Sequence, residues 1–310
     1  MYKADTLHTE NKLLSPFECH IDIFEDNPAT IVDSLVEHCK LQDKQLSKTE
    51  IKQAISKGAL WLTRGKHTQR LRRLKKQLLS GDKLHFYHNA QVLAATVPNA
   101  KLIADLKDYS VWYKPYGMLS QGSKWSDHCT ITRYAQQYFP DERAVFIVHR
   151  LDRAATGLIL VAHSKKAAKL LSALFEKHHL EKHYNIIVHG DFSAQKSSKI
   201  IELPIDGKPA KSTFSLIQYH QESQQSLLQV LIDTGRKHQI RKHAASIGFP
   251  VVGDRLHGDK HLDEKLLQEG RLVDLQLCAV SLSFTCPFSE QVKVFKVADE
   301  DKPSFDSNKA

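Results

Sequence analysis

The second part of the chain alternates many strand-like runs with few helices, and this order limits the possible folds most. From about residue 108 the apolar and β-branched runs are VFIVH, GLILVAH, HYNIIVHG, STFSLIQYH, SLLQVLIDTG, CAVSLSFTCP and EQVKVFKV. Such runs favour strands. Helical patterns interrupt them at TITRYAQQYFP, SKKAAKLLSALFEKH and RKHQIRKHAASIG. Because helices and strands do not alternate regularly, the sequence predicts an α+β fold with a large mixed, mostly antiparallel sheet flanked by helices.

The first 100 residues show a different pattern. SKTEIKQAISKG combines a capping box, Ser47 with Glu50, with an apolar stripe that begins at Ile51, which predicts a helix ending near Gly58. ALWLT and GDKLHFYHN are typical of strands, and VPNAKLIADLKDY of a connector. The 310 residues, 41% of them hydrophobic, can supply two cores. We therefore expect a small α/β domain over residues 1–100, with an irregular lead-in, and a larger domain over residues 101–310.

A basic segment lies between the two strands of the first domain. Residues 64–76 carry seven Lys or Arg and no acid, and Leu71, Leu74 and Leu78 share one helical face, which predicts a basic amphipathic helix. A solvated helix face is one interpretation. Uncompensated charge of one sign gains more from opposing phosphates, and the net charge of +9 agrees with a polyanionic partner. We therefore predict nucleic-acid contact through Arg64, Lys66, Arg70, Arg72, Arg73, Lys75 and Lys76.

Several other functions lack support in the sequence. G-x-x-x-x-G-K-[ST] and G-x-G-x-x-G loops are missing, GMLSQG has one residue too many for a nucleophile elbow, and HHLEKH lacks the zincin spacing. HRLD resembles part of a kinase loop only superficially, because the glycine-rich loop is missing. Five scattered cysteines, no signal-like apolar run and no apolar stretch near the roughly 20 residues of a membrane span lead us to expect a reduced, cytoplasmic protein without metal.

Residues 148–163, VHRLDRAATGLILVAH, place a lone carboxylate in a basic setting. Asp152 lies between Arg150 and Arg153, immediately before an apolar run. This arrangement suits an ionic clasp that holds a turn, and it suits a catalytic acid equally well. A second dense cluster, DTGRKHQIRKH, carries Arg241, which could pair with a carboxylate from elsewhere in the chain or lie at the start of a surface helix. On the residues alone, both questions stay open.

Four segments together resemble the RluA family of RNA pseudouridine synthases. They occur in the order YKPYGMLS, HRLDRAATGLILVA, KHYNIIVHG and DTGRKHQIRKHAASIGFPVVGDRLHG, and the resemblance covers about residues 108–298. The first 100 residues resemble the small RNA-binding domain that is named for a ribosomal protein of the small subunit. That likeness depends on SKTEIKQAISKGAL, GDKLHFYH and the basic segment. The usual Val-Asn-Gly turn is replaced by WLTRGKHTQRLRRLKKQLLS.

The resemblance implies a pseudouridine-synthase fold and the isomerisation of uridine within RNA, with no cofactor and no metal. Asp152 corresponds to the catalytic residue, which either attacks the anomeric carbon or removes a ribose proton. Arg241 corresponds to its ion-pair partner. Tyr184 corresponds to the tyrosine that stacks on the base and assists proton movement from carbon. This chain departs from the family pattern directly after HRLD: the family commonly has Arg-Asp-Thr-Ser-Gly, and this chain has Arg-Ala-Ala-Thr-Gly.

The resemblance also implies an RNA partner, and the two-domain layout favours ribosomal RNA over tRNA. We expect Arg150 to occupy the stack that a flipped uridine vacates. Ile240 and Leu256 are candidates for pocket walls or ordinary core residues, and a monomer is the expected state. The alternative is an RNA-binding or RNA-folding factor whose synthase fold is not catalytic. The remaining expected RNA contacts in the larger domain are Arg153, Arg236, Lys237 and His238.

Overall fold

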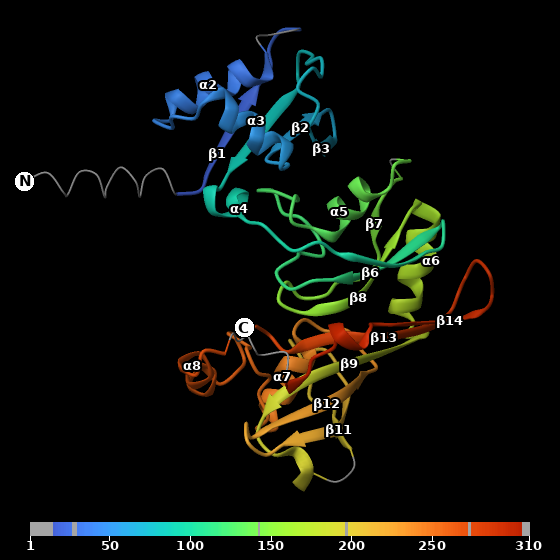
Figure 1. Ribbon diagram of the computed structural model, residues 1–310. Coiled ribbons are helices and arrows are strands. Elements are labelled where there is room, and N and C mark those ends of the chain that lie inside the picture. The colour runs from blue at the N-terminus through green and yellow to red at the C-terminus, as the bar shows by residue number, and fades with distance from the viewer. Residues whose placement is uncertain (1–14, 27–29, 142, 196–197, 272–273, 306–310) are drawn as a thin grey trace, which may run out of the picture. The chain divides into compact units, whose positions relative to one another are not determined.

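The computed structural model describes residues 15–26, 30–141, 143–195, 198–271 and 274–305, in two compact units (Figure 1). Unit 1 comprises residues 1–96 and 121–130, and unit 2 comprises residues 97–120 and 131–310. The return of residues 121–130 to unit 1 is a feature that the sequence analysis does not predict.

Unit 1 is built on an antiparallel sheet of four strands in the order β1-β4-β2-β3 (Figure 1). Its core contains Leu35, Ile51 and Phe86, none of which is measurably exposed. The strands and helices of this unit are β1 (Phe17–Asp22), α2 (Ile31–Leu41), α3 (Lys48–Ser56), β2 (Leu60–Arg64), β3 (His67–Arg70), β4 (Lys83–His88) and α4 (Ala90–Ala94).

Helix α3 begins where the capping box predicts. Glu50 N–H donates to Ser47 Oγ at 3.2 Å, and Ser47 N–H donates to Glu50 Oε2 at 2.7 Å, so two backbone donors at the helix start are satisfied. Ile51, Ala54 and Ile55 are buried, as their spacing predicts. Local sequence is therefore sufficient to determine this helix.

The prediction of a helix over residues 64–76 is wrong. Arg64 and His67 pair across a two-residue turn in which Gly65 has a φ of +57°, and β2 and β3 form a hairpin. The segment after β3 has no helix, yet Leu71 and Leu78 are buried and Leu74 packs against the same core. These leucines reach the core without forming a helix. As far as Leu71, whose N–H donates to Leu60 O at 2.8 Å, pairing with β2 supplies the backbone hydrogen bonds that a helix would otherwise provide.

Unit 2 contains a ten-stranded sheet whose main path runs β10-β11-β12-β9-β13-β8-β6-β5 (Figure 1). β14 pairs with β13, and β7 pairs with β8. The strands are β5 (Lys101–Asp105), β6 (Tyr109–Lys114), β7 (Phe146–Ile147), β8 (Thr156–Ala162), β9 (Leu180–His189), β10 (Lys199–Ile201), β11 (Ser212–His220), β12 (Gln225–Ile232), β13 (Leu277–Thr285) and β14 (Val292–Lys296).

The pairing confirms the predicted mixed, mostly antiparallel sheet of an α+β fold. β13 runs parallel to β8, and the other pairs of this sheet are antiparallel. The α-helices of the unit are α5 (Ile131–Tyr138), α6 (Lys165–Glu176), α7 (Gln239–Ser246) and α8 (Lys260–Gln268), and the short 3-10 helices are η1 (Phe192–Ala194) and η2 (Asp299–Asp301).

The parallel pairing fixes the point at which the loop that carries Asp152 enters the sheet. Gly157 has a φ of +107°, and a Cβ at this position would lie 2.3 Å from the backbone oxygen of Ala279 on β13. Only glycine fits both the backbone conformation and this close approach. The Gly of the ATG sequence therefore has a structural reason: it lets β8 start against β13 directly after the loop that carries Asp152.

Candidate functional site

Asp152 lies in the loop between β7 and β8, and the residue before it is clamped from both sides. Ser120 Oγ donates to Leu151 O at 2.8 Å and accepts from Leu151 N–H at 2.9 Å, and both residues are buried. Ala155 N–H donates to Asp152 O at 3.1 Å, which closes a turn. These contacts fix the backbone of the carboxylate.

A buried lysine holds the other side of this loop. Lys114 is fully buried, and its Nζ donates to Met118 O at 2.8 Å, Pro115 O at 3.1 Å and Arg153 O at 3.4 Å. Burial lowers the pKa of Lys114 to about 7, and the charge of Asp152 opposes this shift. The YKPYGMLS motif thus acts as the brace of the Asp152 loop, a role that the sequence analysis does not assign to Lys114 or Ser120.

His149 anchors the start of the loop to the sheet. Its Nε2 accepts a hydrogen bond from Leu160 N–H at 3.0 Å, and its ring stacks on Phe175 with centroids 4.2 Å apart. Removal of the ring from water lowers the pKa of His149 to about 3, and Lys182 adds to the shift. The ring is therefore neutral and structural, although it belongs to the motif that carries the candidate acid.

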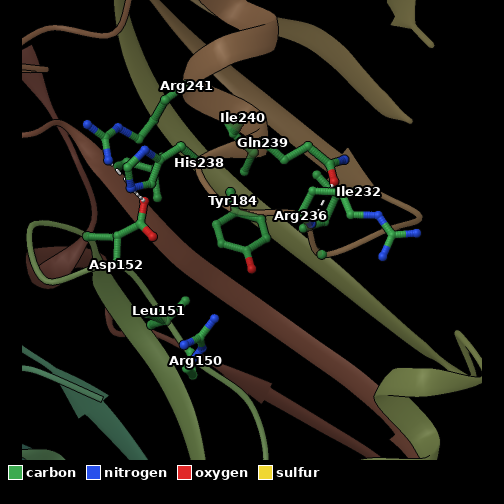
Figure 2. A pocket seen from close by; sticks show the side chains of 13 residues that line it. Arg150, Leu151, Asp152, Tyr184, Ile232, Arg236, His238, Gln239, Ile240 and Arg241 are labelled. Carbon is green, nitrogen blue, oxygen red and sulfur yellow. Dashed lines mark hydrogen bonds and ion pairs between the residues drawn. The ribbon is translucent and has the colours of Figure 1, made fainter. Parts of the chain in front are cut away.

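Arg241 joins the Asp152 loop to a second carboxylate. From α7, its Nη1 donates to Asp152 Oδ2 at 3.1 Å (Figure 2). Its Nε donates to Asp254 Oδ2 at 2.7 Å. The Arg241 side chain is 6% exposed and the Asp254 side chain is fully buried. Burial lowers the pKa of Arg241, but the hydrogen bonds and charges of Asp254 and Asp152 outweigh that effect and raise it. The predicted pairing of Arg241 with a distant carboxylate is therefore present, and it involves two carboxylates rather than one.

Asp254 is a residue of this site that the sequence analysis missed. Its carboxylate also accepts hydrogen bonds from the N–H groups of Leu256 at 3.0 Å and His257 at 3.1 Å. Burial raises the pKa of Asp254, but Arg241 and these two amides outweigh burial and lower it. A sequence signal existed in VVGDRLHG, where an acid follows an apolar pair and precedes a turn, but nothing local pointed to Arg241.

His238 adds a second nitrogen near Asp152. It precedes α7 with a φ of +56°, its Nε2 lies 3.8 Å from Asp152 Oδ2, and its Nδ1 lies 2.9 Å from Nε2 of His257. Burial lowers the pKa of His238, and Asp152 opposes the shift. Burial likewise lowers the pKa of His257. Near neutral pH both rings are therefore neutral, and Arg241 supplies the positive charge beside Asp152.

Tyr184 stands at the centre of a small pocket of about 90 Å³ (Figure 2). The side chain comes from β9, is 9% exposed, and has apolar neighbours in the pocket lining at Ile232, Ile240 and Leu277. Burial raises the pKa of the Tyr184 phenol, and the charge of Asp152 adds to the shift. The site therefore combines a carboxylate, a neutral phenol and apolar walls, which suits a flat ring with one reacting edge.

The structure brings together most, but not all, of the predicted residues of the larger domain. Arg153 is exposed, and its Nε donates to Gly117 O at 3.3 Å. Lys237 is exposed, and it does not line the pocket. Leu256 is 70% exposed, so the prediction that it forms a pocket wall is corrected: the turn that points its N–H at Asp254 directs its side chain outward. Predicted residues that line the pocket are Arg150, Asp152, Tyr184, Arg236, His238, Ile240 and Arg241.

In unit 1, the basic segment divides into paired and exposed cations. Arg64 Nε donates to the buried Asp82 at 2.8 Å. Arg70 and Arg72 both pair with Asp127, which belongs to the returning segment 121–130. These three arginines therefore hold the unit together, and the exposed cations of the segment are Lys66, Arg73, Lys75 and Lys76.

The described ranges contain neither a cluster of metal-ligand side chains nor a helix that could span a membrane. No three His, Cys, Asp or Glu side chains within them gather as potential ligands of a metal ion. Among the helices of those ranges, none combines the length and the apolar composition that a membrane span requires.

Comparisons with known proteins agree on one family. A family model described as RNA pseudouridylate synthase matches residues 108–246. Ribosomal large subunit pseudouridine synthase C of Vibrio vulnificus is 28% identical over 298 residues, which cover 87% of this chain and 90% of that protein. tRNA pseudouridine synthase C of Haemophilus ducreyi is 33% identical over 198 residues, which cover 56% of this chain and 80% of that protein.

Two solved structures share the fold. Human RNA pseudouridylate synthase domain containing 1 matches with a TM-score of 0.56 and 22% identity, over 69% of this chain and 89% of that one. Human RNA pseudouridylate synthase domain containing 4 matches with a TM-score of 0.53 and 20% identity, over 67% of this chain and 90% of that one.

The neutral His149 predicts a pH dependence of stability. Its pKa is 6.5 when unfolded and about 3 when folded, so below pH 6.5 the unfolded chain binds the extra proton. The contribution of neutral His149 to the free energy of unfolding is therefore complete above pH 6.5. It is lost as the pH falls towards 3, at up to about 1.4 kcal/mol per pH unit. In His149→Gln, the free energy of unfolding of the whole chain, measured by urea denaturation from pH 7 to pH 4, should fall less steeply by about that slope.

The matched control is His261→Gln, which changes an exposed histidine on α8. Its slope should equal that of the wild type. An unchanged slope in His149→Gln would contradict the assignment of His149 as a neutral anchor.

Proposed function

Because the chain belongs to the RluA family of RNA pseudouridine synthases and is therefore an isomerase, we propose that it converts uridine in RNA to pseudouridine with Asp152 as the reacting carboxylate. The observation that carries this proposal is the contact of 3.1 Å between Arg241 Nη1 and Asp152 Oδ2 at the edge of the Tyr184 pocket. The arrangement supports a carboxylate held in one orientation for chemistry, in addition to closing a turn.

The geometry leaves one carboxylate oxygen of Asp152 for the substrate. The contacts from Arg241 and His238 both converge on Oδ2, and Figure 2 shows the other oxygen turned away from Arg241. In the reaction the bond between N1 of uracil and C1′ of ribose breaks, the base turns and C5 bonds to C1′. The C5 proton leaves and N1 takes up a proton, so the composition is unchanged. Attack of Asp152 on C1′ and removal of a ribose proton by Asp152 are both compatible with this position. The rearrangement is redox-neutral, so we propose that it proceeds without a cofactor.

Tyr184 suits the handling of the base. Its ring offers a flat face for stacking, and its raised pKa keeps the phenol protonated near neutral pH, so the hydroxyl can donate to or relay a proton near C5. A pocket of about 90 Å³ suits one extruded base rather than a duplex. Arg150 is exposed and lines the same pocket, a position that supports its entry into the stack that the uridine leaves.

We further propose ribosomal RNA as the substrate. The match to the protein named ribosomal large subunit pseudouridine synthase C covers 87% of this chain and so includes most of unit 1. The match to the protein named tRNA pseudouridine synthase C covers 56% of it. A whole-chain likeness supports the ribosomal substrate more strongly than a likeness over the catalytic part.

Loss of Asp152 should abolish the reaction. In Asp152→Asn, tritium release from RNA that carries 5-tritiated uridine should fall by at least about a thousandfold, because the residue can neither attack nor act as a base. Ribosomal RNA transcripts should release tritium with the wild type, whereas tRNA transcripts should release little.

Asp206→Asn is the control, since Asp206 is exposed and pairs with Lys242 outside the pocket. It should retain wild-type activity. Turnover by Asp152→Asn at the wild-type rate would refute the mechanism, and RNA binding by the wild type without tritium release from any stable cellular RNA would favour a non-catalytic binding factor.

We propose that unit 1 contacts RNA through its four exposed cations, Lys66, Arg73, Lys75 and Lys76. Reversal of all four to Glu should weaken RNA binding and reduce the slope of log K against log salt concentration by about 3, because each phosphate contact contributes nearly one unit. Fluorescence anisotropy with labelled RNA at 50–300 mM salt measures both quantities.

The matched control reverses Lys165, Lys166, Lys169 and Lys177, four exposed lysines on and just after α6. That variant should bind RNA with nearly the wild-type slope. If both variants lost the same RNA affinity and salt slope, the basic segment would contribute only through the overall charge of the protein, which would contradict the proposal. Arg64, Arg70 and Arg72 stay unchanged in both variants, because their loss would leave Asp82 and Asp127 without ion-pair partners.

A further inference from the structure

Lys182 on β9 is a charged residue near Tyr184 to which the mechanism above gives no role. It lies two residues before Tyr184, and this even separation places both side chains on one face of the sheet, about 7 Å apart along the strand. Lys182 is partly exposed, and in the described part of the chain its ammonium group has neither a hydrogen-bond nor an ion-pair partner. It lies 5.9 Å from the ring centroid of Phe175, near the outer limit of a cation–π contact. The fold therefore leaves this charge without a strong partner.

Gly235 leaves the Lys182 ammonium group uncovered at the edge of the Tyr184 pocket. Gly235 lines this pocket, and Lys182 Nζ lies 3.8 Å from the point that a Cβ of residue 235 would occupy. Lys182 Nζ has no hydrogen-bond partner, yet it does not belong to the fully buried unpaired atoms of the described chain, so it keeps contact with solvent. Lys182 itself does not line the pocket. Its charge is therefore accessible at the rim of the pocket rather than inside the space for the base.

Positive charge outweighs negative charge at this rim. Arg150 and Arg236 line the pocket, and neither forms an ion pair in the described part of the chain. Arg236 Nε donates to a neutral group, Pro209 O, at 3.1 Å. Burial lowers the pKa of Lys182, and the charge of Asp233, which lies beyond ion-pair distance, opposes this shift. Three cations therefore lie at or beside the pocket without a fixed counter-ion.

A phosphate diester fits this rim in charge and in position. The phosphates on either side of a uridine stay attached to it when the base enters a pocket, so they come to lie at the mouth of the pocket. Contacts to phosphate fix the register and orientation of a nucleic acid on a protein. We propose that Lys182, beside Gly235, binds a backbone phosphate adjacent to the uridine in the Tyr184 pocket and thereby positions that uridine against Asp152. This role rests on the proposed function, since it takes RNA as the substrate.

Two other roles for Lys182 agree less well with the structure. A contact with the uracil ring would need the ammonium group inside the pocket, whereas Lys182 does not belong to its lining. A purely structural role would depend on the contact with Phe175, and a weak contact at that distance does not offset the partial removal of an ammonium group from water. A phosphate at the rim accounts for both the position of the charge and its lack of a partner within the chain.

Binding of two trinucleotides to the full chain, measured by isothermal titration at several salt concentrations, tests this role. ApUpA carries two phosphates, both next to its one uridine, and its methylphosphonate analogue has neutral linkages in the same places. Lys182→Met keeps most of the side-chain length and removes the charge. It should weaken ApUpA binding by about tenfold or more and reduce the slope of log K against log salt concentration by about 0.7. The analogue should bind to the wild type and to the variant equally. Conversion of the uridine leaves both phosphates unchanged, so the comparison does not depend on turnover.

Lys293→Met is the matched control, with the same change at another partly exposed lysine, on β14 and outside the pocket lining. It should leave the affinity and the slope unchanged, and Lys182→Arg, which keeps the charge, should retain the slope. The midpoint of thermal unfolding of Lys182→Met should not fall below that of the wild type, because the variant loses an unpaired charge; a lower midpoint would assign Lys182 to the fold instead.

Three results of the titrations would overturn the phosphate contact. They are an unchanged affinity for ApUpA in Lys182→Met, an equal loss of affinity for the neutral analogue, and no binding of ApUpA by the wild type. Tritium release is measured independently. Its absence, with these differences in binding intact, would refute the proposed activity and leave the phosphate contact standing.

Discussion

The site depends on one arginine shared by two carboxylates. Arg241 donates to Asp152 on one side and to Asp254 on the other, and its planar guanidinium serves both because its donors diverge. A buried charge without partners would destabilise the fold by several kcal/mol. The N–H groups of Leu256 and His257 hold the Asp254 carboxylate, and this carboxylate holds one side of the guanidinium. The opposite side of the guanidinium therefore meets Asp152 in a single geometry.

Charge balance around this arginine explains the buried lysine. The set of Asp152, Asp254 and Arg241 carries one excess negative charge when its groups are ionised. Lys114 lies fully buried beneath the loop, with a pKa that burial lowers to about 7 and that Asp152 holds from falling further. Its three carbonyl acceptors belong to the Asp152 loop and to the turn that braces it. The same side chain therefore fixes the backbone of the loop and offsets part of its charge.

Local patterns in the sequence predicted much of the fold. The capping box of α3, the apolar stripe of α6 and the β-branched runs of β8, β9 and β12 are satisfied by near neighbours, so short windows of sequence suffice. Residues 64–76 failed because leucines three and four apart fit a helix and an irregular buried segment equally well, and the hairpin at Gly65 depended on pairing with β2. The charge of this segment was misjudged for a similar reason, since Asp82 and Asp127, which pair with three of its arginines, lie outside it.

The residues of the site show the same contrast between features that a local motif predicts and features that depend on distant contacts. Asp152, Tyr184 and Arg241 were predicted because their motifs resemble those of a family, and the structure brings all three to one pocket. Asp254, His149 and Lys114 were missed because their roles arise from contacts across the fold: a carboxylate behind Arg241, a neutral ring under β8, and an ammonium group under the loop. The side chain of Leu256 was misplaced because only the turn geometry shows that its backbone, not its side chain, serves the site.

Asp254 holds the guanidinium that Asp152 contacts, so we expect the loss of Asp254 to lower turnover through Arg241. A double-mutant cycle of Arg241→Met and Asp254→Asn, with kcat measured at saturating RNA and folding checked by urea denaturation, tests it directly. Asp254→Asn should lower kcat by about tenfold or more in the wild-type background and by little once Arg241 is Met, a coupling above about 1 kcal/mol. Equal losses from Asp254→Asn in both backgrounds would show that the two residues act independently and would contradict the account.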